Sequence, residues 1–178
     1  MPSSPTLDVW ETIALEAERE SPLWGAARKP EPEHEPIFSP LGEGRYALGI
    51  ETIYEGYLLH YGRPRLFEPP DADTRLLLGD YLYAHGLQRV TALSELTAVA
   101  DLAELISLCA QVRAEGSGDD GDAWAATAAL LGRGDELAVA RAALRDRGDT
   151  TALASLARGA AGSEAVERAL AAHRLRLR

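Results

Sequence analysis

Apolar residues recur at helical spacing along almost the whole chain, and this periodicity limits the fold more than any other feature. A helix whose residues three and four positions apart are apolar can bury one face against its neighbours. The pattern predicts helices over residues 8–20, 45–61, 73–91 and 94–114. No segment shows the strict alternation of apolar and polar residues that is typical of a half-buried strand. The sequence therefore predicts an all-α fold, and 178 residues suit one domain, or one domain with a small appendage.

Two of the predicted helices differ in where their polar residues fall. Residues 73–91 are apolar on nearly every side, which is typical of a helix at the centre of a bundle. Residues 94–114 carry an apolar stripe that includes Leu96, with Asp101 on the opposite side and Ser94 as the expected N-cap. We therefore expect the first helix to be buried all round and the second to direct Asp101 toward solvent.

Five prolines fall within residues 22–40 and interrupt the helical pattern. Proline lacks the amide proton and biases the residue before it toward extended backbone. Residues 1–44 are thus predicted to form an N-terminal helix followed by a Pro-rich arm. Such an arm is either a disordered tether or a segment that wraps a partner through Trp24, Ile37 and Phe38.

The last third of the chain has a different composition. Residues 116–122 are rich in Gly and Asp, which predicts a solvated linker between a helical core over 45–115 and a C-terminal region over 123–178. That region is rich in alanine, and the junctions Gly134-Asp135 and Gly148-Asp149 are typical of one helix ending and the next beginning. Helices of two to three turns are marginal alone, so we expect them to pack against the core.

Charge and composition exclude some classes of protein. Lys and Arg number 18 and Asp and Glu 28, so the net charge of -10 argues against a nucleic-acid binder that relies on electrostatic attraction. No apolar run is long enough for a transmembrane helix, and the first residues lack the features of a targeting signal, so we expect a cytoplasmic protein. The single Cys109 lies in an apolar helical stretch and is expected to be buried.

Short motifs within residues 48–115 follow one another in an order that resembles a known family. Leu-Leu-Leu-Gly-Asp-Tyr-Leu-Tyr, which contains Gly79 and Asp80, is similar to the GDYLL segment of trans-prenyl (polyprenyl) diphosphate synthases. Gly62 and Pro64 stand where the GxP of that family's RRGxP motif belongs. The resemblance implies a helical bundle like the first half of the isoprenoid synthase fold, followed here by short Ala-rich helices.

The resemblance also implies where the family's chemistry would lie. Counting back from the GxP places Glu51, Thr52 and Glu55 at the DDxxD motif, whose aspartates hold Mg²⁺ and diphosphate in the family. One acid is replaced by threonine, and His60 and Tyr61 replace the paired arginines. A second aspartate motif is missing, and the histidines of the chain are scattered without metal-ligand spacing. The chain is therefore predicted to be a degenerate, truncated pseudoenzyme with no catalytic residue, metal or cofactor.

A degenerate relative of this kind resembles a non-catalytic small subunit. The resemblance implies an accessory or scaffold subunit in a hetero-oligomer of isoprenoid or quinone metabolism, with self-association as a further option. Two alternatives remain: a carrier of an apolar isoprenoid or quinone ligand, and a residual Mg²⁺-dependent enzyme that uses the two glutamates. For the tyrosines, filling the protein's own core is the alternative to partner contact. The candidate partner contacts are Trp24, Phe38, Tyr54, Tyr57, Arg174 and Arg176.

Overall fold

The computed structural model describes residues 8–116, 119–133 and 135–177. Within these ranges the chain is helical and contains no strand, which confirms the all-α class. The α-helices are α1 (Val9–Glu20), α2 (Pro22–Ala26), α3 (Ala47–Tyr61), α4 (Ala72–Thr91), α5 (Leu96–Glu115), α6 (Gly121–Ala129), α7 (Asp135–Arg147), α8 (Thr151–Ala161) and α9 (Ser163–Arg176), and the 3-10 helices are η1 (Ser39–Leu41) and η2 (Gly44–Tyr46).

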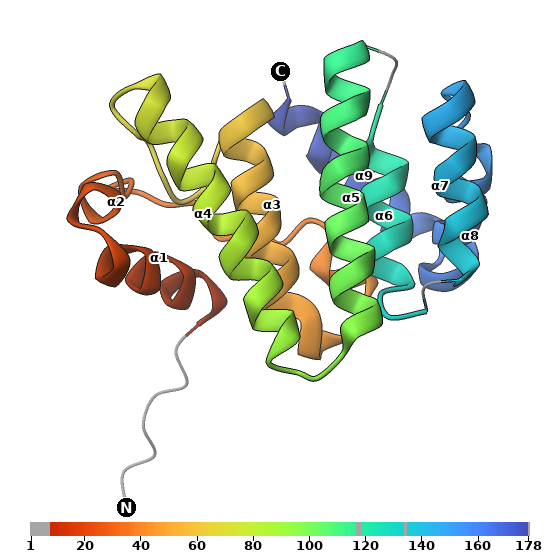
Figure 1. The fold of residues 1–178 in the computed structure, drawn as a ribbon, viewed down its shortest axis with the longest axis horizontal. Coiled ribbons are helices and arrows are strands. Elements are labelled where there is room, and N and C mark those ends of the chain that lie inside the picture. Colours follow the sequence, from red (N-terminus) through yellow and green to blue (C-terminus); the bar gives the residue numbers. More distant parts are fainter. Residues whose placement is uncertain (1–7, 117–118, 134, 178) are drawn as a thin grey trace, which may run out of the picture.

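Helix α3 lies between two hydrophobic clusters. In Figure 1, α3 and α4 lie side by side near the middle, with α1 and α2 on one side and α5–α9 on the other. The smaller cluster joins α3 to α1, α2 and α4, and the larger one joins α3 to α5, α6, α7, α8 and α9. Every residue from Gly49 to Leu59 is consequently buried. The polar groups on this helix must therefore find their partners inside the protein.

Glycines bring α3 and α4 into close contact. A Cβ added to Gly86 would lie 2.4 Å from Cγ1 of Ile53, and one added to Gly56 would lie 2.9 Å from the carbonyl oxygen of Gly79. Each helix thus presents glycine where the backbone of the other passes. The short distance between the helices places the carboxyl end of α3 beside the first turns of α4.

Helix α4 has the predicted bounds, but the prediction that it is buried all round is wrong. Its inward side packs through Leu78 and Leu82, whereas the exposed fractions of Leu76 and Leu77 are 52% and 61%. Because α1, α2 and α3 cover only part of the helix, the opposite face is open to solvent. Helix α4 is therefore at the surface of the bundle.

The orientation predicted for α5 is also wrong. Leu96 is 74% exposed, whereas Asp101 is only 3% exposed. The carboxylate of Asp101 accepts a hydrogen bond of 2.9 Å from Nη1 of Arg141 and one of 3.0 Å from the amide of Gly132. This ion pair with α7 offsets the burial of the carboxylate. Ser94 is not the N-cap but adopts a positive φ of 60° in the preceding turn, and Glu95 occupies the cap position.

The predicted linker over 116–122 is only partly described, because residues 117 and 118 lie outside the described ranges. The prediction of a solvated segment is wrong for the described end of it, because Asp120 is fully buried and α6 begins at Gly121. The C-terminal helices share the larger hydrophobic cluster with α3 and α5. At the predicted helix junctions, α7 begins at Asp135 and Gly148 has a positive φ of 66°, whereas Gly134 lies outside the described residues.

The Pro-rich arm is ordered and packs on its own chain. The amides of Lys29 and Glu33 donate hydrogen bonds of 2.9 and 3.1 Å to the carbonyls of Leu66 and Arg65. Further along, Phe38 is fully buried. The tether interpretation is thus wrong, and the arm wraps the core of this protein instead of that of a partner.

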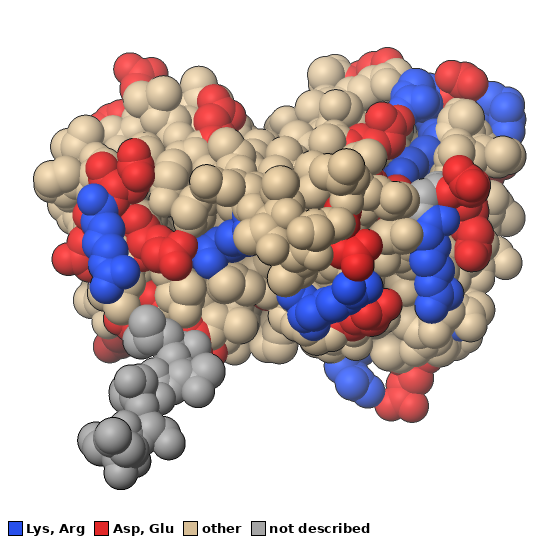
Figure 2. Space-filling view, turned by 60° about the horizontal axis from the view of Figure 1, so that its bottom comes forward, with Lys and Arg blue, Asp and Glu red and all other residues tan. Residues whose placement is uncertain are grey.

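The surface of the described residues has two plain features. No described helix combines the length and the apolar character that a membrane-spanning segment needs. On the face shown in Figure 2, acidic and basic side chains are interspersed, with no broad basic area.

Replacing Gly86 with Ala should destabilise the protein by about 1–3 kcal/mol, because the new methyl group would overlap Ile53 at the crossing of α3 and α4. Gly159→Ala is the matched control, since a Cβ there meets nothing within 4 Å. The control should leave the free energy of unfolding unchanged or raise it by up to about 1 kcal/mol. Urea denaturation measures both values, and equal stability of the two variants would contradict the close crossing.

Candidate functional site

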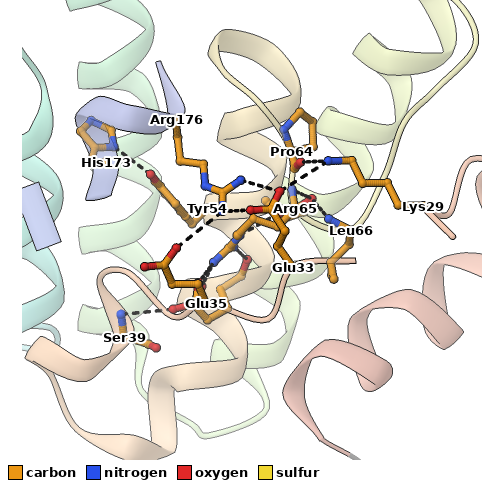
Figure 3. Close-up of polar contacts among 12 residues, drawn as sticks. Lys29, Glu33, Glu35, Ser39, Tyr54, Pro64, Arg65, Leu66, His173 and Arg176 are labelled. Carbon is orange, nitrogen blue, oxygen red and sulfur yellow. Dashed lines mark hydrogen bonds and ion pairs between the residues drawn. The ribbon is translucent and has the colours of Figure 1, made fainter. Parts of the chain in front are cut away.

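The two glutamates at the degenerate DDxxD positions lie inside the protein and share one arginine. Nη1 of Arg65, which is labelled in Figure 3, lies 2.6 Å from Oε2 of Glu51, and its Nε lies 3.0 Å from Oε2 of Glu55. All three side chains are at most 1% exposed. Spacing of one helical turn on α3 places both carboxylates on the same side, toward the segment that follows the helix.

Backbone groups complete this network. Oε1 of Glu55 accepts hydrogen bonds from the amides of Arg65 and Leu66, at 2.8 and 2.7 Å, and Oε1 of Glu51 accepts one of 3.3 Å from the amide of Ser39. Nη1 of Arg65 also donates to the carbonyl of Glu35 at 2.9 Å. Each oxygen of the two carboxylates therefore has a donor, as a buried carboxylate requires.

Aromatic rings cover the guanidinium of Arg65. Its Cζ lies 4.7 Å from the ring centroid of Trp10 and 5.0 Å from that of Tyr54, distances at which a cation interacts with the face of a ring. Burial alone would lower the pKa of Arg65, but the charges of Glu51 and Glu55 raise it above its usual value. The arginine is therefore charged in the folded protein.

These contacts bear on whether the two glutamates could hold Mg²⁺, as the alternative of a residual enzyme requires. A Mg²⁺ ion needs carboxylate oxygens that are open to the metal and to water, whereas Arg65 and backbone amides occupy those of Glu51 and Glu55. Thr52 is buried as well, and its hydroxyl donates to the carbonyl of Leu48 at 2.6 Å. The three positions form a structural network, and their donors do not fit a Mg²⁺ site.

A second buried polar cluster joins α3, α5, α6 and α9. The hydroxyl of Tyr57 donates to Asp120 at 2.8 Å, and Nη2 of Arg113 donates to Asp120 at 2.6 Å. Nε2 of His173 lies 3.2 Å from Oδ1 of Asp120, and its Nδ1 lies 2.8 Å from the hydroxyl of Tyr54. The side chains of Asp120 and His173 are both fully buried.

Asp119, Asp120 and His173 also offer a set of ligand atoms within 4.8 Å of one another. Each carboxylate is already engaged, since Oδ1 of Asp119 accepts the amide of Gly121 at 2.8 Å and Oδ2 lies 3.2 Å from Nε of Arg174. Asp120 is held by its contacts with α3 and α5. The arrangement is therefore a hydrogen-bonded junction between helices and not an open donor set.

The family-like positions Gly62, Pro64, Gly79 and Asp80 have structural surroundings. Gly62 follows α3, and a Cβ there would lie 2.9 Å from the carbonyl oxygen of Arg176; the carbonyl of Pro64 accepts a hydrogen bond of 2.6 Å from Nζ of Lys29. Gly79 lies at the crossing of α3 and α4. Oδ1 of Asp80, on the exposed side of α4, lies 3.2 Å from Nε2 of His60.

Most of the candidate partner contacts are internal. Phe38, Tyr54 and Tyr57 are fully buried, so the prediction that they contact a partner is wrong and they fill the core instead. The predicted partner contact is wrong for Arg176 as well, because its guanidinium binds Glu33 of the same chain at 2.9 and 2.5 Å. Trp24 is half-buried against the ring of Tyr81, and the centroids are 4.3 Å apart.

Arg174 remains partly accessible on α9, with half of its side chain exposed. Sequence reasoning missed Arg65, Arg113 and Asp120, because each finds its partners on a different segment. The sequence does offer one indication that Arg65 is buried: it lies between Pro64 and the apolar pair Leu66 and Phe67, which suggests a buried turn. His173 is one of the scattered histidines of the sequence, and nothing near it in the sequence indicates that Asp120 is its partner.

Replacing Arg65 with Met should destabilise the protein by about 3–5 kcal/mol, because two buried carboxylates would lose their counter-charge. Arg45→Met is the matched control, since Arg45 also binds two carboxylates but is nearly half exposed. The control should leave the free energy of unfolding nearly unchanged. Chemical denaturation at neutral pH tests the difference, and equal losses would contradict a central role for Arg65.

The Asp120 cluster should make stability depend on pH below neutrality. Burial favours a raised pKa for Asp120, but the hydrogen bonds and charges of His173 and Arg113 outweigh it and hold the pKa below its ordinary value. The contribution is therefore complete above the unfolded-state pKa of about 4 and is lost as pH falls through the lower pKa of the folded state.

Asp120→Asn should remove this part of the acid dependence. The urea concentration at the unfolding midpoint should therefore fall less steeply between about pH 5 and pH 2 than it does in the wild type. This range spans the ordinary carboxyl pKa of about 4 and the lower pKa of the folded state. Asp119→Asn, at the neighbouring and partly exposed carboxylate, is the control. If the Asp120 variant loses stability toward low pH as steeply as the wild type does, the ionised Asp120 does not contribute to stability in this way.

The chain matches no family model, no curated protein and no solved structure. The relation to prenyl diphosphate synthases therefore stays a prediction that rests on the short motifs within residues 48–115.

Proposed function

We propose that this protein is a non-catalytic accessory subunit that docks on a protein partner through the outer face of α4. The observation that carries the proposal is the exposed pair Leu76 and Leu77, which lies between the exposed acids Asp73 and Asp80 on one side of the helix. Residues at these spacings share one helix face. An apolar centre with a polar rim is the usual arrangement of a protein interface.

The burial of the two glutamates supports the non-catalytic part of the proposal. Glu51 and Glu55 are neutralised by Arg65 in the core, so they are not available for ionising an allylic diphosphate. Electrostatic stabilisation of a departing diphosphate would need charged groups that are aimed at it. What the motifs retain is consistent with a helical framework rather than with the family's reaction.

The acidic rim favours a partner of a different kind over a second copy of this chain. A twofold interface brings the same patch of both subunits together, so the carboxylates of Asp73 and Asp80 would meet the acidic rim of the second copy and repel it. A partner that presents apolar side chains within a rim of Lys and Arg would match this face in both respects. The proposal therefore commits to a hetero-oligomer.

The test compares Leu76→Glu/Leu77→Glu with Val139→Glu, a control at an 80% exposed apolar residue on α7. Each tagged chain is expressed in its source cells, and the complexes are weighed by native mass spectrometry. We expect a stoichiometric partner with the wild type and the control and none with the α4 variant, because two buried charges without counter-ions oppose docking.

Two results would overturn the proposal. Light scattering of the purified chain could show a dimer that the α4 substitutions dissociate, which would make this face a self-interface. Release of pyrophosphate from an allylic diphosphate by the isolated chain in the presence of Mg²⁺ would show an enzyme.

A further inference from the structure

The turn at Gly62–Pro64 lies where the carboxyl ends of α3 and α9 meet. The amide of Arg63 donates a hydrogen bond of 2.9 Å to the carbonyl of Arg176, and its Nη2 donates to the carbonyl of Leu175. From the other side, Arg75 on α4 donates to the carbonyls of Leu59 and Gly62. Two helix ends that carry partial negative charge are thus bound by two arginines.

Lys29 is the third cation at this turn. Its Nζ donates to the carbonyl of Pro64 at 2.6 Å, and the nearest carboxylate, that of Glu33, is 3.8 Å away. Glu33 itself is held mainly by Arg176, whose hydrogen bonds keep the pKa of Glu33 below its usual range. Among the described residues, Arg63 and Arg75 form hydrogen bonds to carbonyls but have no ion pair with a carboxylate.

A cavity of about 230 Å³ opens beside these three cations. Lys29, Arg63 and Arg75 line it together with Pro64, Phe67 and one acid, Glu68. Each helix end offsets roughly half a charge, and the three cations together outweigh both ends and Glu68. The cavity is therefore positive, in a chain whose net charge is -10.

The cations also keep donors to spare. Arginine carries five N–H donors and lysine three, and the hydrogen bonds to carbonyls use only some of them. Directed donors with a surplus of positive charge are what an oxyanion requires, and charge-assisted hydrogen bonds are the stronger kind.

We propose that this cavity binds a doubly charged oxyanion, of the kind that a phosphate monoester or a dicarboxylate presents. The principal donors come from Arg63 in the turn and from Lys29 on the arm. Arg75 on α4 adds a further positive charge. None of the three stands at His60 or Tyr61, the positions that the resemblance assigns to paired arginines. The site is independent of the α4 docking face, because it is built from the turn, the arm and the inward side of α4.

The test titrates the full chain with inorganic phosphate and, separately, with the dicarboxylate succinate by isothermal titration calorimetry at constant ionic strength. Arg63→Gln and Lys29→Gln should each weaken binding by at least about tenfold, the effect expected for one charge-assisted hydrogen bond. Arg45→Gln is the control: it removes the same charge at the opposite end of α3, where Arg45 is paired with Glu43 and Glu95.

Binding of either anion with this pattern supports the site, and the tighter of the two identifies the source of the oxyanion. Circular dichroism verifies that each variant is folded. If Arg63→Gln is not folded, the result for Lys29→Gln decides whether the site exists. The proposal is overturned if neither anion binds more tightly than chloride titrated in the same way. It is also overturned if Arg45→Gln weakens binding as much as the other two substitutions do.

Discussion

The buried guanidinium of Arg65 is the interaction on which the rest of the structure depends. It joins α3 through Glu51 and Glu55, α1 through the ring of Trp10, and the Pro-rich arm through the carbonyl of Glu35. Desolvating three charged groups is unfavourable, and only their mutual attraction and the backbone donors around them offset it. Each member of such a network depends on all the others, and together with the apolar contacts around it the network fixes the relative positions of the three segments.

The periodicity of apolar residues was sufficient to predict the existence of the main helices and most of their bounds. It could not predict which side of a helix faces inward where a buried charge has a distant partner. Asp101 was expected to face solvent, yet Arg141, forty residues later, makes its burial tolerable. For α4, an apolar sequence on all sides was compatible with the centre of a bundle and with an exposed face, and only the arrangement of its neighbours decides between them.

The candidate site shows the same limit more sharply. Sequence reasoning identified Glu51 and Glu55 as two carboxylates one turn apart, but the partner that determines their chemistry, Arg65, comes from the segment after the helix. A carboxylate pair can hold a metal, remain solvated or bind a cation in the core, and spacing alone does not distinguish these states. Asp120 and His173 were harder still, because a Gly- and Asp-rich stretch is typical of a loop and nothing local marks one of its acids as buried.

The contact between Glu33 and Arg176 has a consequence for the order in which the parts of the chain can fold. These residues are 143 positions apart, and Tyr54 meets His173 across 119. A chain in which α1, α3 and α4 have formed can assemble the surroundings of Arg65, but its arm has no α9 to pack against until that helix has formed as well. Contacts over such separations form slowly, so the side of the arm that faces α9 is covered late in folding.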